Sequence, residues 1–213
     1  MGFCGNARRT VVGMTDRLTA MSVDRVEQIY SSKTSSCQIM EADTEQGRIL
    51  AVEKNKRFFP LNSCYDAKKA SKEWAEQFDR EDINDNSTII VYGLSDGRSI
   101  LELCRKRSNC RVIIYEPCQE IFWKAMEYEE VAQIAENENV CLIVKGICEE
   151  YFFHALQSVL DYSNFQLVVQ AVLPNYLQIF REEYQEMIDV YRSVVELIIF
   201  TRNTMILRGV EIQ

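Results

Sequence analysis

From about residue 88 onward, short apolar runs alternate with helix-like segments, and this alternation restricts the fold more than any other feature. We expect strands at residues 88–92, 111–115, 140–144, 165–172 and 194–201. Helices are expected between them, at residues 98–104, 119–135, 148–160 and 177–192. Strands that are apolar on both faces and separated by helices are typical of a mostly parallel sheet with helices on both faces. The sequence therefore predicts an α/β domain over residues 87–213.

The residues before this domain follow a different pattern. A helix-compatible stretch at residues 16–30 is followed by a serine-rich break. Three short β-rich runs then come close together, as in a β-meander, and an amphipathic helix follows them. These segments are residues 37–41, 48–52, 57–61 and 67–78, and the polar linker is residues 79–87. We therefore expect an N-terminal region over residues 1–79, with a helix, a meander and an amphipathic helix.

Composition excludes several classes of function. The chain of 213 residues has a net charge of −8 and a pI near 4.9, so we expect neither nucleic acid nor an anionic membrane surface as a partner. No apolar run is long enough to span a membrane, and no secretory signal begins the chain, which predicts a cytoplasmic protein. The 8 cysteines contain no C-x-x-C pair. We expect buried thiols and no metal site.

The segment after the first predicted strand carries the strongest candidate site. It reads Gly93-Leu94-Ser95-Asp96-Gly97, and we call it the glycine turn. In parallel sheets of this kind, ligands bind beyond the carboxyl ends of the strands, where glycines allow close approach. Glu116 ends the next strand, about 20 residues after Gly93, where a carboxylate can accept both hydrogen bonds of a ribose diol. This arrangement predicts a Rossmann-like domain with Gly93, Ser95, Asp96, Gly97 and Glu116 as candidate cofactor-binding residues.

The nature of the ligand stays open at this stage. Ser95 stands where a dinucleotide fingerprint has its middle glycine, which argues against a pyrophosphate cofactor. S-adenosylmethionine or a nucleotide-like ligand is compatible with such a turn. Two alternatives need no ligand: a tight strand–helix turn, and a Glu116 that caps the next helix. Methyl transfer lacks further support, because Lys145-Gly146-Ile147 offers no adenine partner and residues 170–176 only weakly resemble an amide-Pro-Pro-aromatic loop.

No catalytic residue can be assigned from the sequence. The single histidine, His154, has aromatic neighbours and is interpreted as a packed or interface residue rather than a general base. The pairs Glu149-Glu150 and Glu182-Glu183 are interpreted as solvated helix faces. The basic cluster Arg105-Lys106-Arg107 fits the end of a helix, where it complements the helix dipole.

Several segments, in order, resemble the N-terminal region of the bacterial motility accessory factor family, whose members are implicated in transferring nonulosonic sugars onto flagellin. The similar segments are residues 61–67 with Glu73-Trp74-Ala75, residues 88–97, residues 112–122, and residues 198–205, a strand followed by Asn203-Thr204. The similarity covers about residues 35–207. Departures include Ser95-Asp96 in the turn and Ala67 in place of a proline.

This resemblance implies an accessory, non-catalytic role, because the family's glycosyl-transfer site is thought to lie in a following central domain. It implies a downstream glycosyltransferase domain or flagellin as partners, and a homo-oligomer is compatible with it. The alternatives left open are an S-adenosylmethionine-dependent methyltransferase and an interaction module that binds no ligand.

Overall fold

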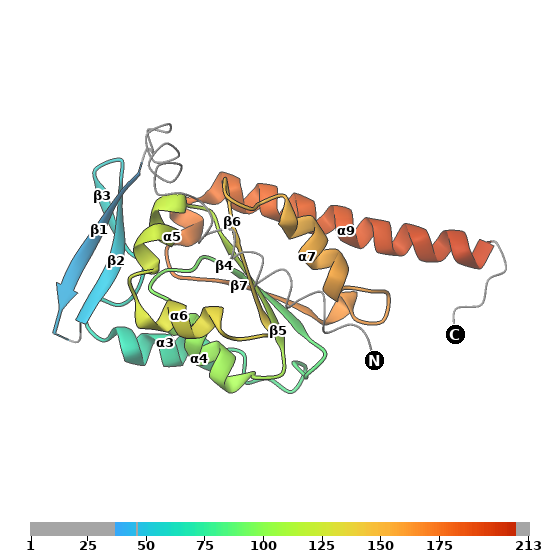
Figure 1. Cartoon of the computed structure of the whole chain (residues 1–213), viewed down its shortest axis with the longest axis horizontal. Helices are drawn as coiled ribbons and strands as arrows, with labels where there is room; N and C mark the ends of the chain where they lie inside the picture. The colour runs from blue at the N-terminus through green and yellow to red at the C-terminus, as the bar shows by residue number, and fades with distance from the viewer. Residues whose placement is uncertain (1–36, 46, 208–213) are drawn as a thin grey trace.

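The computed structural model describes residues 37–45 and 47–207, which form two β-sheets and the helices around them (Figure 1). The first sheet is the predicted meander, with antiparallel strands in the order β1-β2-β3. Its strands are β1 (Cys37–Thr44), β2 (Gly47–Lys54) and β3 (Arg57–Pro60). The helix predicted at residues 16–30 lies outside the described residues.

The second sheet is parallel throughout, with the strand order β6-β5-β4-β7. Its strands are β4 (Thr88–Tyr92), β5 (Arg111–Glu116), β6 (Val140–Val144) and β7 (Val168–Val172). Every residue of β4 is buried, as expected for a central strand that is apolar on both faces. The order matches the first four strands of the Rossmann arrangement. The predicted Rossmann-like fold with a preceding meander is confirmed.

Helices cover both faces of the parallel sheet (Figure 1). Helix α3 (Ala67–Glu76) packs on α4 (Arg98–Lys106), and α4 packs on α6 (Glu129–Ala135), with α5 (Gln119–Ala125) before it. After β6 the chain crosses back over the sheet to reach β7, so α7 (Tyr151–Val159) covers the other face together with α9 (Arg181–Leu207). The short helix α8 (Tyr176–Ile179) joins β7 to α9.

Three predicted elements differ in detail. The helix expected at residues 177–192 is divided at Phe180 between α8 and the start of α9. The single helix expected at residues 119–135 is divided into α5 and α6, because Tyr128 adopts an extended backbone (φ −97°, ψ 134°) and buries its side chain. The first residues of the strand expected at 165–172 form a 3₁₀ turn, Phe165–Leu167. Asn164 holds this turn by donating from its side-chain amide to the carbonyl of Val159 over 2.9 Å.

The predicted fifth strand at residues 194–201 is wrong, because these residues lie within the continuous helix α9. The run is rich in β-branched and aromatic side chains, which favour strands, but tertiary packing overrides this preference. Val194 is buried against the domain while Phe200 is 69% exposed, a distribution that a helix produces. The hydroxyl groups of Thr201 and Thr204 bond to carbonyls one turn earlier in the helix.

The N-terminal region shares its hydrophobic core with the parallel sheet. Leu50 and Val52 of β2 and Trp74 of α3 belong to the same buried cluster as β4 and β5. The Trp74 indole donates to the carbonyl of Val172 over 3.2 Å. The predicted linker is also held in place, since Arg107 donates to the carbonyls of Phe78, Arg80 and Ile83. The two-part division of the chain stays a prediction.

Candidate functional site

The candidate site lies where the strand order of the parallel sheet reverses. The chain runs from β4 outward to β5 and β6, and β7 then pairs with the opposite side of β4. In open α/β sheets, the crevice at such a reversal, beyond the carboxyl ends of the strands, is where ligands bind. The glycine turn leaves β4 at this point, Glu116 ends β5 beside it, and Tyr176 follows β7 on the other side. The structure thus brings the predicted residues together.

Both glycines of the turn have left-handed backbones, with φ of +104° at Gly93 and +80° at Gly97. A Cβ atom on Gly93 would lie 2.6 Å from the ring of Tyr176, and one on Gly97 would lie 2.8 Å from Cγ2 of Val131. Because real Cβ atoms do not approach other atoms so closely, glycine is required at both positions. At Gly93, the space that a side chain would occupy is filled by Tyr176.

Glu116 is fully buried and accepts three hydrogen bonds from the protein itself. The backbone N–H of Leu94 donates to Oε2 over 2.7 Å, and the hydroxyl group of Tyr176 donates to the same oxygen over 2.8 Å. The backbone N–H of Cys118 donates to Oε1 over 2.9 Å. Cys118 is the N-cap residue of α5, and α5 has no side-chain capping bond. Glu116 accepts from the N–H of the N-cap residue itself and from none in the first turn, so it does not cap α5 in the way that the sequence alternative expected.

Tyr176 completes this network. Its hydroxyl oxygen accepts the backbone N–H groups of Ser95 over 2.8 Å and Leu94 over 3.2 Å. The residue is fully buried at the start of α8, behind Asn175, whose backbone is left-handed (φ +66°). Asn175 is itself anchored, since its side-chain amide donates to the carbonyl of Pro60 over 2.6 Å. Together, the phenol of Tyr176 and the carboxylate of Glu116 engage the N–H groups that the turn directs into the crevice.

Sequence reasoning did not assign Tyr176 to the site. It identified residues 170–176 only as a loop with weak likeness to an amide-Pro-Pro-aromatic segment. The fold indicates where to look, because Tyr176 is the first aromatic residue after β7, the strand at the order reversal. That inference needed the strand order, which the sequence pattern does not contain.

Ser95 and Asp96 face away from the crevice, toward the N-terminal region. The Ser95 hydroxyl group donates to the carbonyl of Leu61 over 3.0 Å. Asp96 is buried and accepts from the side-chain amide of Asn62 and from the guanidinium group of Arg98, the latter over 2.9 Å. Arg98 also donates to the carbonyl of Arg48 in β2. These two predicted residues therefore connect the turn to the segment that follows β3.

Burial raises the pKa of both acidic side chains. It raises the pKa of Glu116 from its usual value near 4.5 to about 8, although the donors from Tyr176, Leu94 and Cys118 act in the opposite direction. Burial also raises the pKa of Asp96, an effect that the charge of Arg98 opposes. The pKa of Tyr176 is raised by burial and by the neighbouring Glu116. The phenol therefore stays protonated and donates to the carboxyl group.

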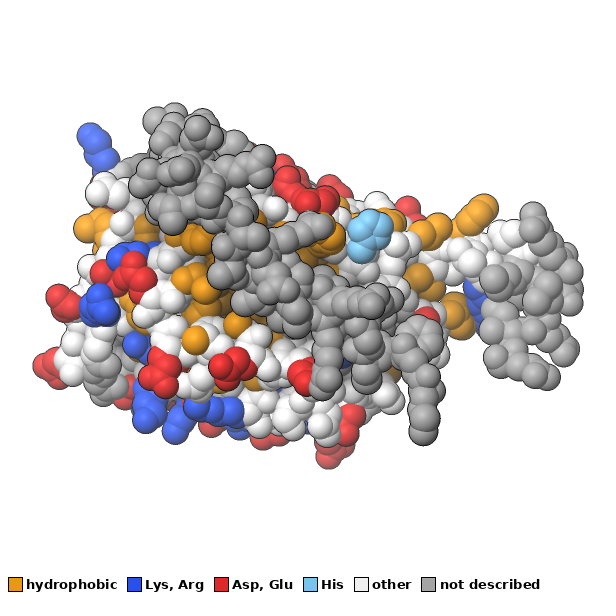
Figure 2. Space-filling model, in the orientation of Figure 1, with side chains coloured by type: hydrophobic (Ala, Val, Ile, Leu, Met, Phe, Trp, Pro, Cys, Tyr) orange, Lys and Arg blue, Asp and Glu red, His pale blue; other side chains and the backbone are white. Residues whose placement is uncertain are grey.

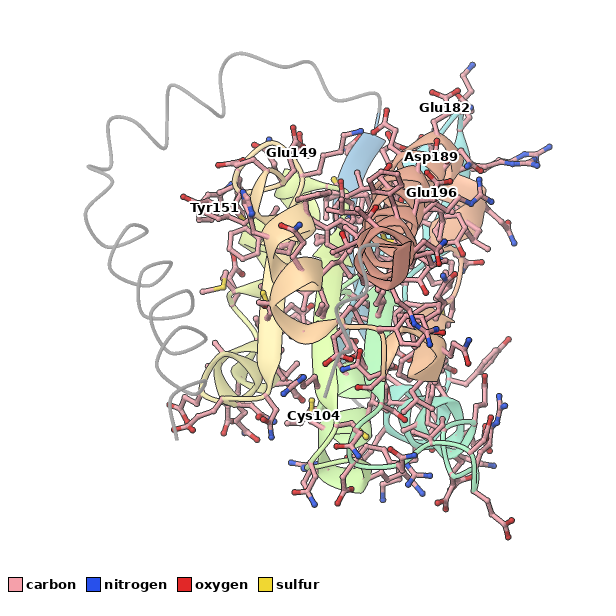
Figure 3. All side chains as sticks on the ribbon, turned by 90° about the vertical axis from the view of Figure 1, so that its right-hand side faces the viewer. Cys104, Glu149, Tyr151, Glu182, Asp189 and Glu196 are labelled. Carbon is pink, nitrogen blue, oxygen red and sulfur yellow. The ribbon has the colours of Figure 1, made fainter. Side chains whose placement is uncertain are left out.

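The other candidate residues lie outside this network. His154 is exposed on α7, with its ring edge-on to Phe153, so the expected packed histidine is a surface residue (pale blue in Figure 2). Glu149, Glu150 and Glu182 are exposed, as predicted, whereas Glu183 is half-buried. Figure 3 shows Glu182, Asp189 and Glu196 at the surface of α9. Lys145, after β6, forms an ion pair with Glu186.

Among residues 37–45 and 47–207, no group of three or more histidine, cysteine or acidic side chains could hold a metal ion. Cys104, Cys110 and Cys148 are buried free thiols, as expected, and Cys141 is partly buried. Arg105 and Lys106 lie in the last turn of α4, where the sequence predicted a cluster that complements the helix dipole. No helix in this described part of the chain has the length and apolar character to span a membrane.

No protein-family model and no curated protein sequence matches the chain. Solved structures match it at low similarity. One is the spermidine synthase from Thermotoga maritima, at 13% identity and a TM-score of 0.35, with 55% of this chain and 44% of that chain covered. Another is MnmC2 from Aquifex aeolicus, at 12% identity and a TM-score of 0.32, with 65% and 55% covered. This chain thus spans about half the length of these structures.

Proposed function

We propose that this chain is a non-catalytic, Rossmann-like accessory domain whose ligand crevice is closed by its own side chains. The observation that carries the proposal is the hydroxyl group of Tyr176, which lies 2.8 Å from Glu116 Oε2 and 2.8 Å from the N–H of Ser95. A ligand at the turn would need these same groups. Its ribose diol would need Glu116, and its polar atoms would need the N–H groups of Leu94 and Ser95.

The energetic cost of opening this crevice supports the proposal. Binding a ligand would first require Tyr176 to leave a fully buried position and to break its bonds with Glu116, Leu94 and Ser95. A buried tyrosine contributes a large apolar surface, and each of these hydrogen bonds contributes about 0.5–1.5 kcal/mol. A ligand would have to supply this energy in addition to the usual cost of association.

The setting we propose is a flagellin-glycosylation protein of the motility accessory factor type. It rests on the resemblance of segments within residues 35–207, including the glycine turn and the strand that ends at Glu116. In that setting the domain would support or position a glycosyltransferase domain, or would contact flagellin. The single histidine, His154, is exposed and lies outside the network around Glu116, which fits a supporting role better than histidine-based catalysis.

The second candidate is an S-adenosylmethionine-dependent methyltransferase. It is favoured by one observation, the placement of Glu116 within 2.7 Å of the Leu94 N–H at the end of β5. This is the position at which Rossmann-like enzymes bind a ribose. The two candidates differ in whether Tyr176 leaves the crevice when the cofactor is present.

Calorimetric and thermal-shift titration separates the candidates. The wild-type protein is titrated with S-adenosylmethionine, CMP and a CMP-linked sugar, each to the highest soluble concentration. Saturating a site to a hundredfold excess over Kd would raise the unfolding free energy by about 2.7 kcal/mol. We expect no saturable heat and no thermal shift with any of the three compounds.

Two variants identify the site if binding occurs. Glu116→Gln removes the carboxylate at the turn, and Glu182→Gln removes an exposed carboxylate on α9 as the matched control. Saturable binding of S-adenosylmethionine that Glu116→Gln abolishes and Glu182→Gln preserves would contradict the accessory role and favour the methyltransferase. Saturable binding of the CMP-linked sugar that Glu116→Gln abolishes and Glu182→Gln preserves would contradict the closed crevice. That result would still agree with a role in flagellin glycosylation.

A further inference from the structure

The end of the meander contacts both walls of the crevice. Pro60 is the last residue of β3, and Leu61 follows it. The carbonyl of Pro60 accepts from the side-chain amide of Asn175 over 2.6 Å. The carbonyl of Leu61 accepts from the hydroxyl group of Ser95 over 3.0 Å. Asn175 directly precedes Tyr176, and the N–H of Ser95 donates to the Tyr176 hydroxyl group. Two adjacent carbonyls therefore join the segment that carries Tyr176 to the turn that Tyr176 covers.

Another contact from the meander holds the far end of α8. The ammonium group of Lys54, the last residue of β2, donates to the carbonyl of Ile179 and lies 5.9 Å from the centre of the Phe180 ring. Ile179 ends α8, and both Ile179 and Phe180 are buried. We call Lys54, Pro60 and Leu61 the meander clasp. The clasp holds α8 at both ends, beside the edge of the parallel sheet at which the meander lies (Figure 1).

Helix α8 is a short unit of its own. Asn175 before it has φ of +66°, and Phe180 after it has φ of −123° and ψ of 51°, so neither residue continues the helix. A helix of 4 residues is not stable in isolation, so its position depends on the contacts around it. Those contacts come from the meander clasp, from the crevice through Tyr176, and from Tyr92, whose hydroxyl group donates to the carbonyl of Phe180 over 2.7 Å.

We propose that the meander clasp controls the opening of the crevice, because Tyr176 leaves Glu116 and the N–H of Ser95 when α8 moves away from the meander. The inference rests on the proposed function in one respect, the closure of the crevice by Tyr176. It adds a second state, in which the carboxyl group and the N–H groups of the turn are accessible. Displacement of the meander would therefore be the event that opens the site.

Hydrogen exchange of the Ser95 amide in the full-length protein, measured by NMR at several low urea concentrations, tests the second state. The Tyr176 hydroxyl group accepts this N–H, so the exchange rate reports how often the phenol leaves. The amide of Ile90 reports unfolding of the whole domain, because β4 lies between β5 and β7. We expect Ser95 to exchange about tenfold or more faster than Ile90, with a weaker dependence on urea, because a local opening exposes less surface. Equal rates and equal urea dependence would overturn the proposal.

Two variants test the clasp, each by removing one bond. Lys54→Met keeps the unbranched stem of the side chain, and Asn175→Gly suits the left-handed backbone at that position. We expect Ser95 exchange to be about tenfold faster in Lys54→Met, which loses a charge-assisted bond, and about threefold faster in Asn175→Gly. Lys54→Arg keeps a cationic donor and should restore most of the protection. The two bonds are separate, so one variant that folds is sufficient. Unchanged Ser95 exchange in a folded variant would overturn the proposal.

Two control variants separate the clasp from general stability. Lys72→Met replaces an exposed lysine of α3 and should change neither amide. Leu156→Ala removes a buried side chain of α7, which packs on α9, β5 and β6. It should accelerate exchange at Ile90 and leave Ser95 at the wild-type rate. Equal acceleration of Ser95 by Leu156→Ala and Lys54→Met would overturn the proposal. These measurements need no ligand, so their failure is distinguishable from a positive ligand titration, which contradicts the proposed function.

Discussion

The Tyr176→Phe variant tests the closed crevice at the level of a single oxygen atom. The substitution keeps the ring that packs on Gly93 and removes the hydroxyl group. The N–H of Ser95, in a buried residue, then loses its acceptor, and Glu116 loses one of its three donors. A buried N–H without a partner costs about 1–3 kcal/mol, and a hydrogen bond to a carboxyl group that is neutral below its pKa of about 8 contributes about 0.5–1.5 kcal/mol.

These contributions are offset in part, because burying the ring of phenylalanine requires no desolvation of a hydroxyl group. We expect a net loss of about 2–4 kcal/mol in the free energy of unfolding. For a domain of this size, that loss lowers the Tm by about 5–15 °C. Urea unfolding followed by tryptophan fluorescence measures it, since Trp74 is buried in the core.

The matched control is Tyr65→Phe, because the side chain of Tyr65 is 90% exposed and its hydroxyl group contributes little to the folded state. A Tyr176→Phe variant within about 0.5 kcal/mol of the wild type, and therefore equal to the control, would refute the reasoning. It would mean that the turn's N–H groups are satisfied by water and that the crevice is open to solvent.

Three further predictions concern the same region. Gly93→Ala should lower the free energy of unfolding, measured with urea, by about 3 kcal/mol or more. The new Cβ atom would lie 2.6 Å from the Tyr176 ring, on a left-handed backbone. A change below about 1 kcal/mol would contradict this prediction. The pKa of Glu116 is raised to about 8, so its stabilising contribution is complete below pH 4.5 and is lost as the pH rises toward 8. The free energy of unfolding should fall by about 3–5 kcal/mol between about pH 4.5 and 8, and Glu116→Gln should remove this fall. An equal pH dependence in the variant would contradict the assignment of the raised pKa to Glu116. Arg98→Ala should lower the free energy of unfolding by about 2–4 kcal/mol, because it leaves the buried carboxylate of Asp96 without its cation. Arg105→Ala, in an exposed ion pair, should lower it by less than about 0.5 kcal/mol. Equal losses for the two variants in thermal unfolding would contradict this prediction.

Much of the fold could be predicted from the sequence, because buried parallel strands have a strong local signature. The continuous apolar runs gave β4 and β6 with their observed bounds, and the meander was recognisable from its β-rich runs. The same signature failed at residues 194–201. There, β-branched residues lie on α9, near whose end Leu197 and Phe200 are exposed. The preference of these residue types for strands does not indicate whether a neighbouring strand is available for pairing.

The candidate site was predictable only in part. Gly93, Gly97 and Glu116 could be placed at the ends of adjacent strands because turn chemistry and spacing are local properties. The hydrogen bonds of these residues could not be predicted, because they depend on Tyr176. Tyr176 lies far along the chain, and only the strand order brings it to the turn. The orientation of Ser95 and Asp96 away from the crevice depends in the same way on contacts with Leu61 and Asn62.

The backbone amides of Leu94 and Ser95 report most directly on whether the crevice is closed from within. Their resonances in a ¹H–¹⁵N spectrum of the wild-type protein can be followed during addition of S-adenosylmethionine, CMP and a CMP-linked sugar. The closed crevice predicts that both resonances stay in place at every ligand concentration, because the hydroxyl group of Tyr176 accepts from both N–H groups. Saturable movement of both resonances with any of these compounds, reproduced in the Glu182→Gln control and absent in Glu116→Gln, would contradict it.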